Sequence, residues 1–159
     1  MNVNVVCIGK LKERYWQEAC GEYAKRLSRF MSLHVTELKE ERLPNKAGAA
    51  EERAVKEAEG QAILKALPEE AFVIALDLKG KTMDSPALAH YLDDLRLQGR
   101  SHIAFVIGGS LGLSESVLHR ADLRLSFSEF TFPHQLMRVI LLEQLYRACK
   151  ISAGEKYHK

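Results

Sequence analysis

The fold class is decided by two stretches, FVIAL at residues 72–76 and IAFVI at residues 103–107. Both are apolar throughout and contain several β-branched residues, which is typical of parallel strands buried on both faces. A shorter apolar run, Leu123–Leu125, follows them. Between the first two runs, Ser85 as an N-cap and Pro86 at the first helical position predict a helix. This alternation predicts an α/β domain with a mainly parallel sheet flanked by helices.

The same alternation extends toward the N-terminus. The segment ahead of Gly9 predicts a first strand, and apolar residues spaced by three and four from Leu11 to Phe30 predict an amphipathic helix. Ser32–Leu38 alternates apolar and polar residues, which predicts a strand at or near the edge of the sheet. A further helix is expected from residue 51 to residue 67, although Gly60 in its middle costs about 1 kcal/mol relative to alanine.

The composition fits one folded domain, residues 1–159. Of the 159 residues 47% are hydrophobic and 28% charged, and the loosest stretch runs from Glu40 to Ala50. No apolar run approaches the roughly 18 residues of a membrane span, and the N-terminus lacks a basic leader. Three scattered cysteines favour neither a disulfide framework nor a zinc site. We therefore expect a cytoplasmic protein without a membrane partner.

The charges are almost balanced. Lysine and arginine number 23 against 21 acidic residues, which gives a net charge of +2. The pI of about 8.4 lies below the value above about 9 that is typical of a domain gripping nucleic acid alone. A nucleic-acid partner would therefore have to meet local basic clusters or two subunits together.

The last predicted helix, from Pro133 to about Ser152, has more apolar residues than one sheet face can bury. These residues are Leu136, Met137, Val139, Ile140, Leu141, Leu142, Leu145, Tyr146 and Cys149. A second copy of the chain would cover the remainder, which predicts a homodimer. The alternative is a central helix buried on both sides within one subunit.

Three segments follow predicted strands, where open parallel sheets bind ligands. They are Asp77–Lys81, Gly108–Ser114 and Ser126–Phe132. The glycines of the second match neither a dinucleotide fingerprint nor a P-loop, so they predict either close approach to a ligand or only a turn and a helix cap. The third sets three phenylalanines among hydroxyl residues, which suits either a heteroaromatic ligand such as adenine or a packed loop.

The remaining polar candidates are the histidines, the cysteines and the tail. The six histidines form no ligand motif, so no metal site is predicted, and the cysteines are expected to be inert thiols. The tail from Gly154 to Lys159 is polar, basic and aromatic at once. Such a tail is either a frayed terminus or a functional segment.

Short motifs spread over nearly the whole chain resemble one known family. They are GKLK (9–12), FVIGGSLG (105–112), LSFS (125–128), TFPHQLMR (131–138), EQLYRA (143–148) and the closing YHK (157–159). Together they resemble the RlmH family, the pseudouridine methyltransferases of the large ribosomal subunit within the SPOUT superfamily.

The resemblance implies a single SPOUT-type domain with a C-terminal trefoil knot, acting as a homodimer. It implies methyl transfer from S-adenosylmethionine to N3 of a pseudouridine in the 23S rRNA of the assembled ribosome, with no DNA partner. A surface built from two subunits would meet the RNA, so one strongly basic domain is unnecessary. The cofactor site that the family implies comprises Leu76, Gly108, Phe127, Ser128, Glu129, Phe130, Thr131 and Phe132.

The family's functional tail, residues 153–159, holds the expected catalytic residues. Because N3 must lose a proton, His158 is expected to handle that proton, with Tyr157 positioning or stacking on the nucleotide and Lys159 as the cation. Arg138 and Glu143 are expected to organise the last helix or the dimer.

Two other functions stay open. One is a dimer that binds a nucleotide or the ribosome without turnover, which predicts cofactor binding without methyl transfer. The other is an unrelated α/β enzyme that binds a mononucleotide at the glycine loop, which predicts equal binding of other adenosine ligands.

Overall fold

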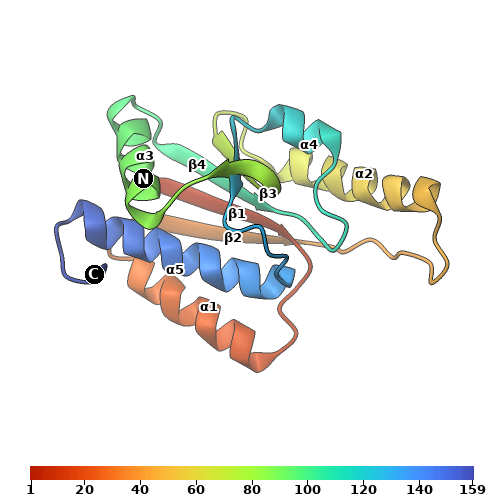
Figure 1. Cartoon of the computed structure of the whole chain (residues 1–159), viewed down its shortest axis with the longest axis horizontal. Helices are drawn as coiled ribbons and strands as arrows, with labels where there is room; N and C mark the ends of the chain where they lie inside the picture. Colours follow the sequence, from red (N-terminus) through yellow and green to blue (C-terminus); the bar gives the residue numbers. More distant parts are fainter.

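Five parallel strands form one sheet, with helices on both of its faces (Figure 1). The structure is a computed structural model that describes residues 1–159. In chain order its elements are β1 (Asn2–Ile8), α1 (Arg14–Leu27), β2 (Ser32–Leu38), α2 (Ala49–Ala66), β3 (Phe72–Thr82), α3 (Ser85–Leu97), β4 (His102–Ile107), α4 (Glu115–Arg120), β5 (Leu123–Ser126) and α5 (His134–Ser152). The predicted α/β class is confirmed.

The strand order β2-β1-β4-β3-β5 explains why the central strands are apolar throughout. Alternate side chains of a strand point to opposite faces of the sheet, and here both faces are covered. Val5 and Phe105 enter one hydrophobic cluster, whereas Val6 and Val106 enter a second cluster on the other face. β2 pairs only with β1 and most of its side chains are exposed, so the predicted edge strand is also confirmed.

The helices divide between the two clusters. α1, α3 and α5 contribute to the larger one, and α2 and α4 to the smaller one. α5 contacts both α1 and α3 and runs between them (Figure 1). Leu141, Leu142 and Leu145 are fully buried there, whereas Val139 and Tyr146 are half-buried. Two helices of the same chain therefore cover much of α5, and half-buried apolar residues remain on its other sides.

The predicted end of β3 is wrong. The strand continues past its apolar stretch to Thr82, so Asp77–Lys81 is not a free loop after the strand. Leu125 of β5 pairs with both Leu76 and Lys81, and the residues between these two bulge out of the ladder.

Contacts with β5 hold the bulge. Arg124 Nη2 and Nε donate to Asp77 Oδ2 at 2.6 and 2.8 Å. A Cβ at Gly80 would lie 2.6 Å from backbone atoms of Arg124, so only glycine fits this approach. The strand is therefore extended by pairing with a distant segment, which no local pattern encodes.

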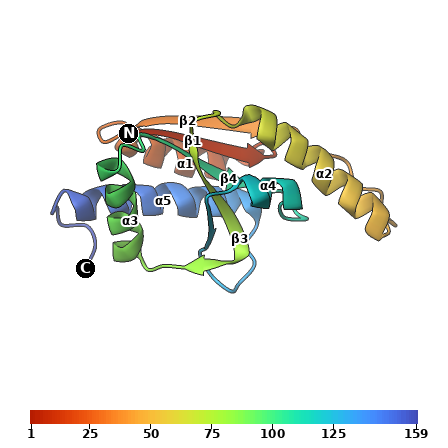
Figure 2. The same ribbon diagram turned by 90° about the horizontal axis from the view of Figure 1, so that it is seen from above.

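Helix starts and ends differ from expectation by a few residues. The N-cap of α3 is Asp84, whose Oδ1 accepts from a backbone N–H of the first turn at 2.8 Å, so the prediction of Ser85 as N-cap is wrong. α1 ends at Leu27 and leaves Phe30 in the following turn. α5 agrees with its predicted bounds. Figure 2 shows α2 extending beyond the carboxyl ends of β1 and β2. None of the helices combines the length and the apolar character that a membrane span requires.

Candidate functional site

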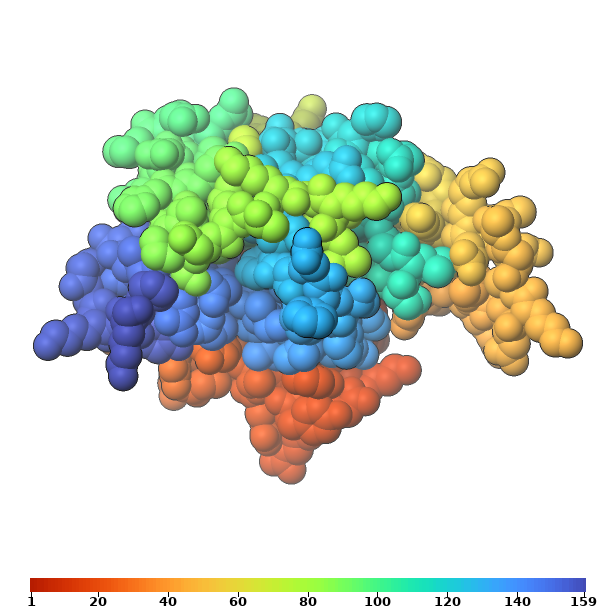
Figure 3. All heavy atoms as spheres, in the orientation of Figure 1, coloured from red at the N-terminus to blue at the C-terminus, as the bar shows by residue number.

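A pocket of about 480 Å³ opens at the carboxyl ends of β3 and β5. Its walls come from the β3–α3 connection, the end of β5, α5 and the tail. The lining residues are Met83, Asp84, Ser85, Pro86, Leu88, Leu125, Ser126, Phe127, Phe132, Ile140, Gln144 and His158. Figure 3 shows the β3–α3 connection, in green, next to α5 and the tail, in blue. Parallel sheets bind ligands at this end of their strands.

The loop after β5 is held by its own serines. Ser126 Oγ donates to the carbonyl of Ser128 at 3.1 Å, and Ser128 Oγ accepts from the N–H of Phe130 at 3.0 Å. Phe127 and Phe132 line the pocket, whereas Phe130 is 77% exposed. The turn therefore presents two aromatic side chains to the pocket and a third to solvent.

The structure brings some of the expected cofactor residues together and leaves others apart. Phe127 and Phe132 share the pocket, and Leu76 packs with Phe127 against one hydrophobic cluster. Gly108 directly follows β4, the neighbour of β3. Leu76 and Gly108 do not line the pocket, and neither do four expected residues of the loop after β5: Ser128, Glu129, Phe130 and Thr131.

The glycines after β4 close a tight turn. Gly112 has φ +81° in the left-handed region, and its N–H donates to the carbonyl of Gly109 at 3.1 Å. A Cβ at Gly108 would lie 2.9 Å from backbone atoms of Gly112. The loop after β4 is therefore a tight turn, and Gly108 is held without a side chain because the backbone of Gly112 occupies that space.

The tail folds back on α5 and is not frayed. Tyr157 donates its hydroxyl to Glu143 Oε1 at 3.2 Å. Its ring centre lies 4.9 Å from that of Tyr146 and 4.7 Å from the guanidinium carbon of Arg147. Burial and the nearby carboxylate of Glu143 raise the pKa of Tyr157 to about 12. The phenol therefore stays protonated and serves as a donor, with its ring packed against the protein.

Arg147 connects the tail to α5. Its Nε and Nη2 donate to Glu143 Oε1 at 3.0 and 2.6 Å, and its Nη1 lies 3.4 Å from His158 Nδ1. His158 in turn lines the pocket. Lys159 is exposed at the end of the chain. Of the three expected catalytic residues, His158 thus lines the pocket, and Tyr157 packs against the residues of α5 that hold the tail.

Sequence reasoning assigned no role at the site to Ser85 or Gln144, and it counted Arg147 only among the basic residues near the tail that could meet RNA. Ser85 Oγ donates to Gln144 Oε1 at 2.5 Å, and Gln144 Nε2 donates to Glu143 Oε2 at 2.6 Å. One signal was available in the sequence, because an acid and an arginine four residues apart on a helix predict an ion pair. Gln144 has two partners: Ser85, which lies on α3, and Glu143, its neighbour on α5. The contact with Ser85 depends on how the two helices pack, which the sequence does not show.

The thiols are set up to be unreactive. Cys7 and Cys20 are buried and Cys149 is half-buried, and none forms a disulfide. Burial raises the pKa of Cys7 and of Cys149 to about 11, and it also raises the pKa of Cys20. The thiol form therefore dominates at neutral pH, in agreement with the expected inert cysteines. No group of three or more metal-ligating side chains occurs in the chain.

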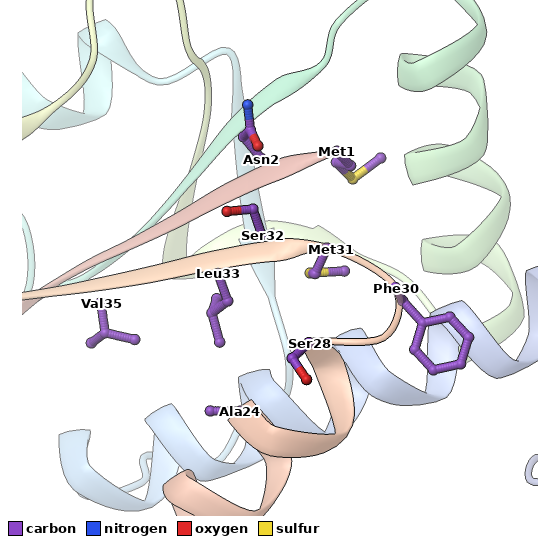
Figure 4. Close-up of a pocket in the computed structure, with 9 residues that line it drawn as sticks. All are labelled: Met1, Asn2, Ala24, Ser28, Phe30, Met31, Ser32, Leu33 and Val35. Atoms are coloured by element: carbon purple, nitrogen blue, oxygen red, sulfur yellow. The ribbon is translucent and has the colours of Figure 1, made fainter.

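A second hollow, of about 690 Å³, lies between α1 and β2 (Figure 4). Met1, Asn2 and Ser32 place it at the amino ends of β1 and β2, and Leu33 and Val35 give it an apolar side. It contains no acidic, basic, histidine or cysteine side chain. No titratable side chain therefore lines this hollow, and it lies at the opposite end of the strands from the first pocket.

Comparison with known proteins first defines the class. The family model described as "Predicted SPOUT methyltransferase" matches residues 1–158. The sheet and its flanking helices are thus those of a SPOUT methyltransferase domain.

Individual relatives then narrow the class. Proteins named "Ribosomal RNA large subunit methyltransferase H" are 57% identical in Clostridium novyi (strain NT), 52% in Clostridium acetobutylicum and 53% in Clostridium botulinum (strain Kyoto / Type A2), over the full length of both chains in each case. The chain therefore belongs to the family of ribosomal RNA large subunit methyltransferase H, and the resemblance to RlmH is confirmed.

Proposed function

We propose that the chain is an S-adenosylmethionine-dependent methyltransferase that acts on N3 of a pseudouridine in the 23S rRNA of the assembled ribosome. The printed name of its relatives supports a methyltransferase of large-subunit rRNA. The cofactor, the pseudouridine and N3 rest on the resemblance of the motifs to the RlmH family. One observation carries the proposal to individual residues: His158 of the tail lines the same pocket as Phe127 and Phe132 of the expected cofactor loop.

The residues present fit an adenosine-bearing cofactor. Phe127 and Phe132 offer flat apolar walls of the kind that pack against adenine. Gly108 directly follows β4, the neighbour of β3, and puts no side chain at the end of that strand. We assign the binding of S-adenosylmethionine to Leu76, Gly108, Phe127, Ser128, Glu129, Phe130, Thr131 and Phe132.

When bound, S-adenosylmethionine supplies a methyl group that leaves its sulfonium as the N3–CH3 bond forms and N3 gives up its proton. The chain's own residues then have to orient the acceptor base and meet the charge that develops on it. We assign to His158 the contact with the imide of the base and the handling of its proton. Tyr157 positions the tail, and Lys159 makes a cationic contact with the base or the RNA.

We further propose a homodimer, a C-terminal trefoil knot and a place in the cytoplasm, where the ribosomes are. The dimer is supported by the charges of the tail. Arg147 is paired with Glu143 and Lys150 with Glu155, whereas Lys156 and Lys159 are exposed. Of these four cations, two per chain therefore lack a carboxylate partner, and two tails together would double that number.

The first test incubates the protein with methyl-labelled S-adenosylmethionine and ribosomes that lack the modification. We expect label on N3 of one pseudouridine of the 23S rRNA. Label at another atom or base would contradict the proposed specificity. Donor binding without labelled RNA, on ribosomes that a competent enzyme modifies, would favour the non-catalytic binding dimer, and equal binding of other adenosine ligands would favour the mononucleotide enzyme.

A binding measurement tests the cofactor site separately. Phe127→Ala is expected to weaken binding of S-adenosylmethionine by about tenfold, because it removes an aromatic wall. Phe30→Ala is the matched control, since Phe30 lines the other hollow. Equal affinities of the two variants, measured by calorimetry, would remove Phe127 from the cofactor site.

A further inference from the structure

We propose that Arg147 holds His158 as a hydrogen-bond donor toward the acceptor base, so that His158 stabilises the anion formed at N3 and does not remove its proton. The inference rests on the proposed function. It decides whether His158 acts as a hydrogen-bond donor or as a general base.

The argument starts from the donors of Arg147. Its Nε and Nη2 both donate to Glu143 Oε1, which leaves Nη1 facing His158 Nδ1 at 3.4 Å. A guanidinium has donors only, so Nδ1 of the imidazole has to accept. A neutral imidazole carries one proton, which is then on Nε2. The nitrogen left for a ligand is an N–H donor and has no lone pair with which to take a proton.

Neighbouring side chains hold Arg147 in this orientation. Glu143 also accepts from the hydroxyl of Tyr157 and, through its second oxygen, from Gln144 Nε2. The ring of Tyr157 stacks against the guanidinium, and Tyr157 directly precedes His158 in the chain. The contacts that orient the arginine thus also place the backbone that carries the imidazole.

Apart from His158, the lining of the pocket offers a single carboxylate, Asp84, and one of its two oxygens, Oδ1, is engaged in capping α3. Ser85 and Gln144 are hydrogen-bonded to each other. In this setting the proton of N3 passes to water, and the negative charge spreads from N3 onto the two flanking carbonyl oxygens. A donor at one of these oxygens binds the anion more strongly than the neutral base, which lowers the barrier.

Three variants of His158 separate a donor from a base. His158→Gln keeps an N–H near the position of Nε2 but has no basic atom. His158→Asn places its amide nitrogen near the position of Nδ1 instead. His158→Ala has neither an N–H donor nor a basic atom. Single-turnover methyl transfer is measured at saturating donor and ribosomes. We expect the alanine and asparagine variants to lose about 10²–10³-fold in rate and the glutamine variant to stay at least about tenfold faster than either. A glutamine variant within tenfold of alanine would overturn the donor role and make His158 the base.

A double-mutant cycle tests the role of Arg147 as a positioning residue. Arg147→Lys keeps the charge beside Glu143 but lacks the fork that reaches both Glu143 and His158. We expect it to slow transfer by about tenfold when residue 158 is histidine and by less than about threefold in the His158→Gln background, since an amide has no tautomer to set. Equal losses in both backgrounds would show that Arg147 only anchors the tail.

A readout without turnover is the nitrogen-15 NMR signal of His158 in the free protein. We expect the neutral ring to carry its proton on Nε2, and a proton on Nδ1 would overturn the inference. Because His158 is exposed near the chain end, its three variants should keep the wild-type unfolding temperature. If the wild-type protein labels no pseudouridine, the proposed function fails. If it labels N3 and the glutamine variant is as slow as alanine, only the present inference fails.

Discussion

Arg138 is a buried cation that ties α5 to the ends of β1 and β2. It is 3% exposed, and its Nη1 donates to Glu37 Oε2 at 2.6 Å and its Nη2 to the carbonyl of Gly9 at 3.0 Å. Its Nε has no partner. The contacts lie within one chain, so Arg138 organises the last helix, one of the two roles expected for it from sequence. Glu143 likewise pairs with Arg147 inside the last helix, and it also accepts from Tyr157 of the tail.

Replacing Arg138 should therefore cost stability. Arg138→Met keeps the apolar stem but leaves the Gly9 carbonyl unpaired and Glu37 without its cation, and we expect the free energy of unfolding to fall by about 2–3 kcal/mol. Urea denaturation at fixed protein concentration measures it. Arg14→Met is the control, because Arg14 is 89% exposed in its pair with Glu18 and should change stability by less than about 0.5 kcal/mol. Equal effects of the two substitutions would show that burial adds nothing.

Two helical glycines should respond in opposite ways to alanine. A Cβ at Gly60 in α2 would lie 2.1 Å from Ser114 Oγ, whereas a Cβ at Gly21 in α1 would meet no atom within 4 Å. Gly60→Ala is expected to destabilise by about 1–3 kcal/mol through overpacking, despite the higher helix propensity of alanine. Gly21→Ala should stabilise by about 0.5–1 kcal/mol. Thermal unfolding of both variants checks this, and shifts of the same sign would contradict it.

At the level of elements, the contact of the tail with α5 depends on a protonated phenol. The pKa of Tyr157 is about 12 in the folded protein, above the value near 10 of an unfolded tyrosine. Folding therefore favours the protonated form, and its contribution to stability is fully present below about pH 10 and lost as the pH rises through about 12.

The measurement is the difference in unfolding free energy between the wild type and Tyr157→Phe. We expect this difference to shrink between about pH 10 and pH 12, because the phenylalanine variant has no proton to lose. Tyr15→Phe serves as the control, since Tyr15 is 61% exposed and its difference from wild type should stay flat. A Tyr157→Phe difference that is constant with pH would mean that the phenol does not hold the tail.

At the level of the whole molecule, the half-buried apolar residues of α5 favour a second copy of the 18.0 kDa chain. α1 and α3 cover α5 on two sides, which leaves less apolar surface than the sequence alone predicts. We expect light scattering to give twice the chain mass, and the unfolding midpoint to rise with protein concentration. A single-chain mass with a concentration-independent midpoint would favour the helix buried within one subunit.

The parts of the site differed in how far the sequence predicted them. The aromatic loop after β5 could be predicted from the sequence. Phe127 and Phe132 lie between an apolar run that predicts a strand and a proline that predicts the start of a helix, and both patterns are local in the chain. The bulge of β3 was not, because Asp77 and Gly80 are held by Arg124, far along the chain. The contact of Arg147 with His158 likewise depends on how the tail turns back.

The sequence by itself determined the α/β class, the parallel sheet with its edge strand, the extent of the last helix and the family. These follow from periodicity, from strands without polar side chains and from short motifs, all of which are local in the chain. Only the tertiary structure decided the length of β3, the pocket between β3, β5 and α5, and the network of Glu143, Arg147, Tyr157 and His158. Most of these contacts join segments that the chain alone does not place side by side, and their free energy is realised only after the sheet and the helices have packed.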